Sequence, residues 1–134
     1  MQTAVEQARE RVGMAIQMRR VYDPPEPNDG YRVLIDGLWP RGITKEAAHL
    51  DEWARDLAVS TPLRRWFGHD PAKWDEFRRR YRAELLVPEH RAALDVLARR
   101  ARHGTVTIVY GARDKQHNNA VVLTEVLQER PGSA

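Results

Sequence analysis

The stretch TVTIVYGARDKQHNNAVVLTEVL, residues 105–127, carries the strongest structural signal in this chain. It begins with a short apolar run from Val106 to Tyr110, which predicts a buried strand. A polar turn with Arg113 and Asp114 follows, and the pattern after it predicts an amphipathic helix over about residues 115–129. A strand, a charged turn and a helix N-terminus are typical of α/β proteins, which often bind anions there. The stretch therefore predicts the fold class and the place of a candidate site.

Two further strands are predicted upstream, at residues 14–20 and at Tyr31–Asp36. The second holds the continuous apolar run Val33–Ile35, which indicates burial on both faces, as in a parallel sheet between helices. The connection between these strands is too short for a helical crossover, so they form a hairpin or the first lies at an edge. Residues 43–103 have a helical pattern, in which Leu50, Trp53 and Leu57 are spaced for one helix face. We expect a small three-layer α/β domain, with a short, mostly parallel sheet of three strands flanked by helices.

The 134 residues suit one compact domain, which we expect to span residues 15–130. Residues 1–14 are predicted to be an N-terminal extension and residues 131–134 a C-terminal tail. No apolar run approaches the roughly 20 residues of a membrane-spanning helix, and the N-terminus lacks the apolar core of a signal peptide. We therefore expect a cytoplasmic location and no membrane partner.

The chain has no cysteine, which excludes disulfides, thiol nucleophiles, zinc–thiolate sites and iron–sulfur clusters. Its formal net charge is +3, and all but three of its 22 basic residues are arginine. Arginine suits bidentate contacts with phosphate or carboxylate, but a GC-rich genome also explains such an excess. A small net charge is a weak signature of nucleic-acid binding.

The turn after the second predicted strand holds one set of candidate site residues: Asp36, Trp39, Arg41 and Gly42. Carboxyl ends of parallel strands face the ligand crevice in α/β proteins, so Asp36 could act as a general base or orient Arg41. A structural alternative is a buried Asp36–Arg41 pair that fixes the turn, with Trp39 in the core.

The turn after Tyr110 holds the second set: Arg113, Asp114, His117 and Asn118. Asp114 is a good N-cap candidate, and Arg113 beside a helix N-terminus suits an anionic ligand. His117 would then lie in the first helical turn, where the helix dipole favours neutral imidazole, which can act as a base. His69, next to an aspartate between two predicted helices, is a further possible site residue. No spacing matches a metal motif, so we expect no metal site and no cofactor.

Three long blocks of the sequence resemble the YeaO-like family of bacterial proteins, domain of unknown function 488. They are RVYDPPEPNDGYRVLIDGLWPRG (20–42), WFGHDPAKWDEFRRRYRAEL (66–85) and VTIVYGARDKQHNNAVVL (106–123). The resemblance implies an α/β fold and an intracellular bacterial protein. It implies no established biochemical activity. One position departs from the family pattern, because Gly37 stands where the family usually has arginine.

The leading functional hypothesis is that a crevice at the strand ends binds a small anionic ligand, such as a nucleotide or a phosphorylated metabolite. If the protein is an enzyme, Asp36 and His117 are the predicted catalytic residues of a hydrolase or transferase. The alternative is an interaction module that binds nucleic acid or protein through the arginine-rich helices at residues 64–82. Oligomeric state is left open by the sequence.

Overall fold

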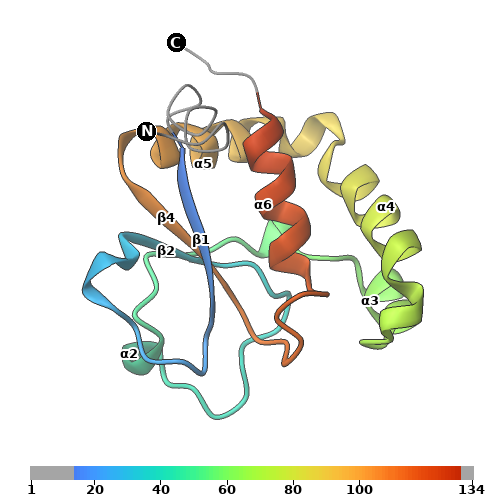
Figure 1. The fold of residues 1–134 in the computed structure, drawn as a ribbon, viewed down its shortest axis with the longest axis horizontal. Coiled ribbons are helices and arrows are strands. Elements are labelled where there is room, and N and C mark those ends of the chain that lie inside the picture. Colours follow the sequence, from blue (N-terminus) through green and yellow to red (C-terminus); the bar gives the residue numbers. More distant parts are fainter. Residues whose placement is uncertain (1–13, 131–134) are drawn as a thin grey trace, which may run out of the picture.

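A computed structural model describes residues 14–130 and shows a four-stranded sheet in the order β1-β4-β2-β3 (Figure 1). The strands are β1 (Ala15–Arg20), β2 (Tyr31–Leu34), β3 (Glu52–Trp53) and β4 (Thr105–Tyr110). Every neighbouring pair is parallel, so the strand C-termini meet at one edge of the sheet. The predicted α/β class and parallel sheet are therefore confirmed. Apart from Met14, the expected terminal extension and tail lie outside the described residues.

The first two strands do not form a hairpin, because β4 lies between them. Register partners Met18 and Val33 both pair with Ile108, from opposite sides of β4. Of the two arrangements left open by the sequence, β1 at an edge is the correct one. β4 is apolar and buried over most of its length because both of its neighbours are strands and both of its faces are covered.

The prediction that residues 43–103 are helical is wrong at Glu52–Trp53, where β3 adds a fourth strand. Leu50 and Trp53 pack against a cluster on one face of the sheet, whereas Leu57 belongs to the core on the other face. The three residues are spaced as on one helix face, but they do not form one, because the chain passes from one side of the sheet to the other between them. A strand of two residues is too short to show the alternation that identifies strands.

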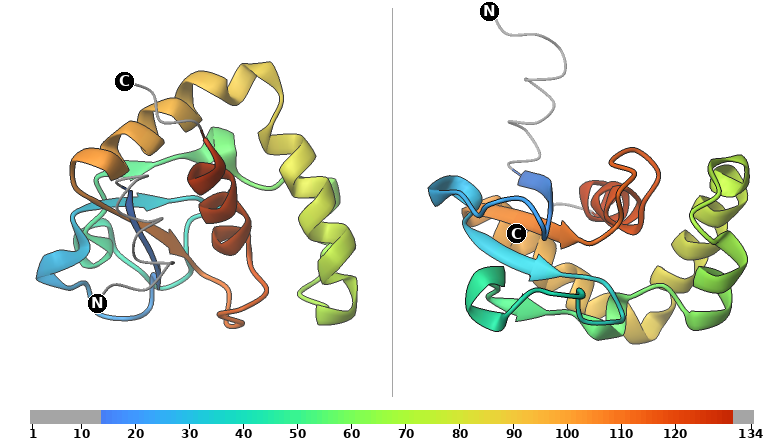
Figure 2. Two further views of the ribbon diagram at one scale, coloured as in Figure 1. Left: turned by 45° about the horizontal axis from the view of Figure 1, so that its top comes forward. Right: turned by 90° about the horizontal axis from the view of Figure 1, so that it is seen from below.

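Four helices contribute to the main core: α3 (Thr61–Phe67), α4 (Trp74–Leu85), α5 (Arg91–His103) and α6 (Asn119–Glu129). α5 and α6 pack on the sheet face that presents Val33, Ile35, Val106 and Ile108, and α4 packs against α6 and α3 (Figure 2). Short 3-10 turns precede or join these elements: η1 (Pro27–Asp29), η2 (Arg55–Leu57), η3 (Pro71–Lys73) and η4 (Pro88–His90).

The second sheet face has a smaller cluster, formed by Val21, Leu34, Ala48 and Val109. It is covered by the four-residue helix α2 (Lys45–Ala48) and by loops rather than by a full helical layer. The expected three layers are thus unequal in thickness. Within residues 14–130, no helix combines the length and apolarity needed to cross a bilayer.

The last helix begins four residues later than the sequence pattern predicts. Asn118 is its N-cap, with extended backbone angles and a side-chain oxygen that accepts a hydrogen bond from Val121 N at 3.1 Å. Asp114 instead caps the preceding turn, where it accepts from the backbone N–H groups of Gln116 and His117. His117 is therefore outside the helix, and the dipole argument for its neutral imidazole does not apply.

Candidate functional site

A cavity of about 280 Å³ opens at the C-terminal ends of β2 and β4, between α3 and the start of α6. The residues that matter for its chemistry are Asp36, Trp39, Arg64, His69, Gly111 and Asn119. We refer to this feature as the strand-end cavity. Its position matches the crevice in which open parallel α/β sheets generally bind ligands.

Asp36 is the partly buried carboxylate of the strand-end cavity, and both of its oxygens are held by hydrogen bonds. Asn119 Nδ2 donates to Asp36 Oδ1 at 2.7 Å, and Gly111 N donates to Asp36 Oδ2 at 2.8 Å. Its backbone carbonyl accepts a bond from Trp53 Nε1 at 2.7 Å. Three elements, β3, β4 and α6, therefore converge to fix one side chain at the end of β2.

Burial raises the pKa of the Asp36 carboxyl above its ordinary value of 3.8. The hydrogen bonds from Asn119 and Gly111 and the proximity of His69 oppose this change but do not cancel it. A carboxyl group with a raised pKa in a cavity can exchange a proton or accept a hydrogen bond from a ligand. The Asp36 carboxyl can therefore take part in proton exchange at a pH where an exposed aspartate is fully ionised.

Gly111 is required for the close approach of β4 to Asp36. A Cβ atom at this position would lie 2.8 Å from Asp36 Oδ2, closer than any real Cβ contact. Gly37 also lines the cavity, but a Cβ there would meet only the Ala58 Cβ, at an ordinary 3.5 Å. The two cavity glycines therefore differ: a side chain at position 111 would collide with Asp36, whereas a Cβ at position 37 would make only an ordinary contact.

Aromatic rings form much of the apolar wall. Phe67 from α3 and Phe77 from α4 stack with ring centroids 4.1 Å apart. Trp39 packs edge-on against Trp53 at 5.3 Å and donates its Nε1–H to the Ile43 carbonyl at 2.6 Å, which anchors the loop 37–43. These rings give the cavity flat apolar surfaces beside the Asp36 carboxylate.

The exposed side chains of Arg64 and His69 line the cavity from α3 and the turn after it. Within residues 14–130, no ion pair or hydrogen bond involves the Arg64 guanidinium, so it is available to a ligand. His69 has a left-handed backbone with φ of 58° and follows Gly68, also left-handed at 54°. Such a conformation is uncommon for a residue other than glycine. It presents the His69 ring near Asp36, consistent with its influence on that carboxyl.

Of the residues predicted from sequence, Asp36, Trp39, His69 and Asn118 line the strand-end cavity. Asn118 is nonetheless committed to structure, since it is only 2% exposed and caps α6 while donating to the Asp114 carbonyl at 2.8 Å. His117 lies outside the cavity lining, where its Nδ1 is 2.9 Å from Asp114 Oδ2 and its ring meets Trp74 edge-on. Backbone bonds from Gln116 and the contact with His117 hold the pKa of Asp114 below its usual value.

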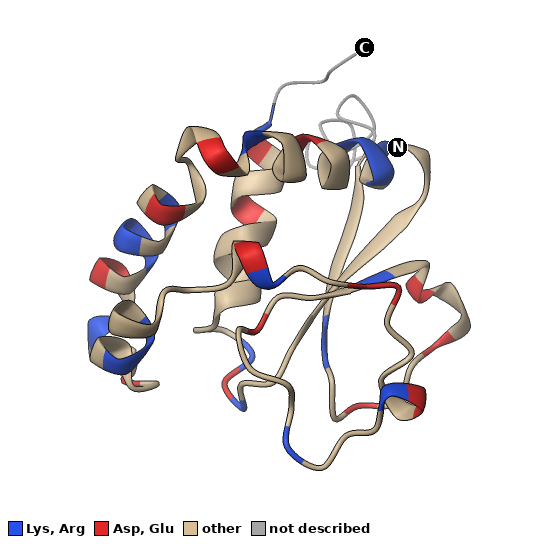
Figure 3. Ribbon diagram, turned by 180° about the vertical axis from the view of Figure 1, so that it is seen from behind, with Lys and Arg blue, Asp and Glu red and all other residues tan. Residues whose placement is uncertain are grey.

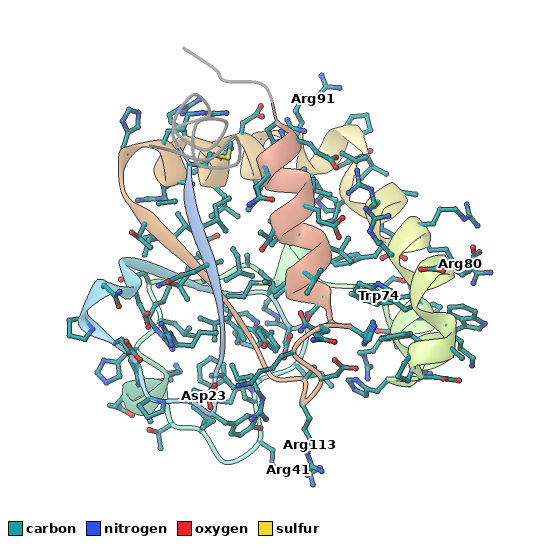
Figure 4. The ribbon with its side chains drawn as sticks, viewed as in Figure 1. Asp23, Arg41, Trp74, Arg80, Arg91 and Arg113 are labelled. Carbon is teal, nitrogen blue, oxygen red and sulfur yellow. The ribbon has the colours of Figure 1, made fainter. Side chains whose placement is uncertain are left out.

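Arg41, Gly42 and Arg113 also lie outside the cavity lining. Figure 4 shows the Arg41 and Arg113 side chains at the same end of the molecule, both directed outward. The backbone carbonyl of Arg41 accepts a hydrogen bond from the Tyr22 hydroxyl at 3.0 Å, so its loop adjoins the cavity even though its side chain does not. Gly42 is an exposed turn residue with φ of 80°. The structure therefore does not pair Arg41 with Asp36.

Of the six residues that matter for the chemistry of the cavity, sequence reasoning missed three: Arg64, Gly111 and Asn119. Gly111 directly follows the apolar run of β4, so its position was a usable signal for close backbone approach. Asn119 follows Asn118 at the start of an apolar helix, where either residue could be the cap. Arg64 stands beside Arg65 in α3, and nothing local distinguishes the residue that faces the cavity.

No cluster of three or more metal-binding side chains occurs among residues 14–130. Asp36, His69 and His117 are accordingly not assembled into one cation site. The chemistry that the cavity offers is a carboxylate acceptor, aromatic surfaces and a guanidinium donor.

Acidic and basic residues alternate along α4 (Figure 3), and the arginines of its basic segment are largely paired with carboxylates. Arg78 pairs with Glu125 and Arg82 with Glu129, both across to α6. Arg79 and Arg80 share Glu76 within α4. This run is therefore a mixed-charge face, whereas the nucleic-acid hypothesis requires a continuous basic one.

The chain was compared with known proteins. It is 43% identical over 115 residues to the Escherichia coli (strain K12) uncharacterized protein YeaO, covering 86% of this chain and 98% of that protein. It is 38% identical to an uncharacterized protein of Mycobacterium tuberculosis (strain H37Rv), over 86% of this chain and 95% of that protein. No solved structure matches significantly. The sequence profile described as "Inactive DUF488-N3 subclade" matches residues 15–132. The chain therefore belongs to the YeaO-like DUF488 family of proteins.

Proposed function

We propose that this protein binds a small organic anion, such as a nucleotide or a phosphorylated metabolite, in the strand-end cavity. The observation that carries the proposal is the combination of Asp36 and Arg64 on one cavity with aromatic walls. Arg64 has no partner among the described residues, and an arginine at a cavity is well suited to bidentate contact with phosphate or carboxylate.

The size of the cavity supports a compact ligand. Its volume of about 280 Å³ lies just below the range of roughly 300–1,000 Å³ found for small-molecule sites. Gly37 extends the free space, because no side chain occupies the position at which the resembling family usually has arginine. We infer that Arg64 supplies the guanidinium that contacts the anion in this chain.

Binding without turnover is the form of the proposal that the subclade description "inactive" favours. Hydrolysis or group transfer would use Asp36 as the acid or base, with His69 rather than His117 beside it. The two forms differ in a simple observable, since an enzyme converts the bound compound and a binding protein releases it unchanged.

A thermal-shift screen followed by calorimetry tests the proposal. Nucleoside monophosphates, sugar phosphates, dicarboxylates and inorganic phosphate are offered to the full chain, and each bound compound is analysed for conversion. Arg64→Ala should weaken binding by about ten- to a hundredfold, since a hydrogen bond to a charged group contributes about 1.5–3 kcal/mol. Arg65→Ala is the matched control, because Arg65 is exposed on the same helix but does not line the cavity. Equal effects of the two substitutions, or no ligand in the screen, would contradict the proposal.

A further inference from the structure

Asp36 is a partly buried carboxylate for which no ion-pair partner occurs among residues 14–130. Each carboxylate oxygen of Asp36 accepts one described hydrogen bond. Asn119 Nδ2 donates to Oδ1, and Gly111 N donates to Oδ2. An ionised carboxylate has about four acceptor positions. Each Asp36 oxygen therefore retains an acceptor position, and a buried charge of this kind is normally matched by further donors.

The two oxygens of one carboxylate can accept two parallel N–H groups from a single planar partner. Because Asn119 and Gly111 are fixed by α6 and by the end of β4, the carboxylate is held in one orientation before any ligand arrives. Such prior fixation reduces the entropy that binding must remove. The carboxylate therefore favours a rigid donor pair over a single hydroxyl or a flexible amine.

The walls beside Asp36 favour a flat ring. Trp39, Phe67 and Phe77 line the cavity, and Tyr22 lies at its edge. Proteins that hold a single nucleobase combine stacking against aromatic or apolar side chains with hydrogen bonds to its Watson–Crick edge. Among the common bases, guanine alone presents a ring N–H and an exocyclic amine side by side as donors on that edge.

We propose that the strand-end cavity recognises a guanine nucleotide, whose N1–H and 2-amino group donate to Asp36 and whose phosphate contacts Arg64. This inference rests on the proposed function for the phosphate end of the ligand. The base end rests separately on Asp36, its two fixed donors and the aromatic walls. Asp36 thereby selects the base, and Arg64 binds the anion.

The test compares GMP, IMP, AMP and guanosine by calorimetry with the full chain. IMP differs from GMP only in lacking the 2-amino group, so the GMP-to-IMP affinity ratio measures that one donor without any substitution in the protein. We expect GMP to bind about ten- to a hundredfold more tightly than IMP, and AMP to bind least. Equal affinities for GMP, IMP and AMP would overturn the inference.

Asp36→Asn replaces one acceptor oxygen by a donor and should reduce the GMP-to-IMP ratio to about one. Asp56→Asn is the matched control, because Asp56 is exposed in η2 and does not line the cavity. If the GMP-to-IMP affinity ratio is unchanged by Asp36→Asn, Asp36 does not recognise the base. Should Asp36→Asn fail to fold, the ratio in the unsubstituted protein still decides the selectivity for guanine.

The ligand series separates the two proposals. Phosphate-dependent binding that requires Arg64 but ignores the base would support the anion site and overturn the guanine inference. Binding of guanosine as tight as that of GMP, with loss on Asp36→Asn, would support the guanine inference and contradict the role of Arg64. Absence of binding by both guanosine and GMP would overturn the inference outright.

Discussion

Two aspartates illustrate how surroundings decide the role of one residue type. Asp36 has hydrogen bonds but no ion pair with any residue between 14 and 130, and burial raises its pKa. Asp29 is 1% exposed and lies between Arg32 and Arg19, with nitrogen–oxygen distances of 2.6 Å and 3.0 Å. Burial of Asp29 acts to raise its pKa, but bonds from Glu26 N, Arg32 and Arg19 outweigh that effect and lower it. Asp29 is thus stabilised as an ion inside the fold, whereas the described contacts of Asp36 are hydrogen bonds from Asn119 and Gly111.

The lowered pKa of Asp29 predicts an acid-sensitive contribution to stability. A carboxyl whose folded pKa lies below its unfolded value of 3.8 stabilises the fold above that pH and loses this contribution as the pH falls through the folded pKa. Asp29→Asn should therefore lower the free energy of unfolding by about 3–5 kcal/mol at pH 7, because it leaves a buried Arg32 without its counter-charge. Urea unfolding at pH 7 and at pH 3 measures the difference, which should shrink at the lower pH. A difference that stays constant with pH would contradict this assignment.

The two cavity glycines give a prediction with an internal control. Gly111→Ala places a methyl group 2.8 Å from Asp36 Oδ2 and should reduce the free energy of unfolding by about 1–3 kcal/mol, the usual cost of overpacking. Gly37→Ala meets only the Ala58 Cβ at 3.5 Å, so it should be neutral or stabilise by up to about 1 kcal/mol through reduced unfolded-state entropy. Thermal unfolding of both variants checks this. Equal destabilisation by the two substitutions would show that the Asp36–Gly111 contact is looser than the structure indicates.

At the scale of elements, the start of α6 is the structural link between the charged turn and the cavity. Asn118 uses both ends of its amide, accepting from Val121 N and donating to the Asp114 carbonyl. This arrangement holds Asn119 where its Nδ2 reaches Asp36. The turn before α6 thus acts at the cavity through Asn118 and Asn119, while Asp114 and His117 bond mainly to each other.

Loss of the Asn118 cap should therefore be costly. Asn118→Ala removes a buried cap and leaves the Asp114 carbonyl without its donor, so we expect a loss of about 2 kcal/mol or somewhat more in the free energy of unfolding. Thr44→Ala is the comparison, since Thr44 caps only the exposed four-residue helix α2 and should cost about 1 kcal/mol or less. Chemical denaturation of both variants measures the ranking. A larger loss for Thr44→Ala would contradict the central role given to the α6 cap.

At the scale of the whole molecule, the sequence predicted the sheet better than the site. Strands β2 and β4 are recognisable because each is rich in apolar residues, which is the pattern of strands buried on both faces. β3 could not be recognised, since its two residues show no periodicity. A candidate site was predicted at the strand ends, and the strand-end cavity lies in that region of the fold. The arginine proposed to contact the anion was not identifiable from the sequence, because only the packing of α3 distinguishes Arg64 from its neighbour Arg65.

The distribution of charge over the molecule predicts weak binding to nucleic acid. Four arginines of α4 are paired with Glu76, Glu125 and Glu129, so few cations on this face are free to displace counterions from a phosphate backbone. We expect no DNA or RNA binding tighter than the non-specific range of about 10⁻⁴–10⁻⁶ M at physiological salt.

The double substitution Glu125→Gln, Glu129→Gln should raise the affinity for nucleic acid and steepen its salt dependence, because it frees Arg78 and Arg82. It should leave the protein folded, since these ion pairs are partly exposed and pairs near the surface contribute about 1 kcal/mol or less each. Fluorescence anisotropy across a salt series measures both proteins. Tight, steeply salt-dependent binding by the unsubstituted chain would favour the interaction-module hypothesis and show that these pairs open on contact with nucleic acid.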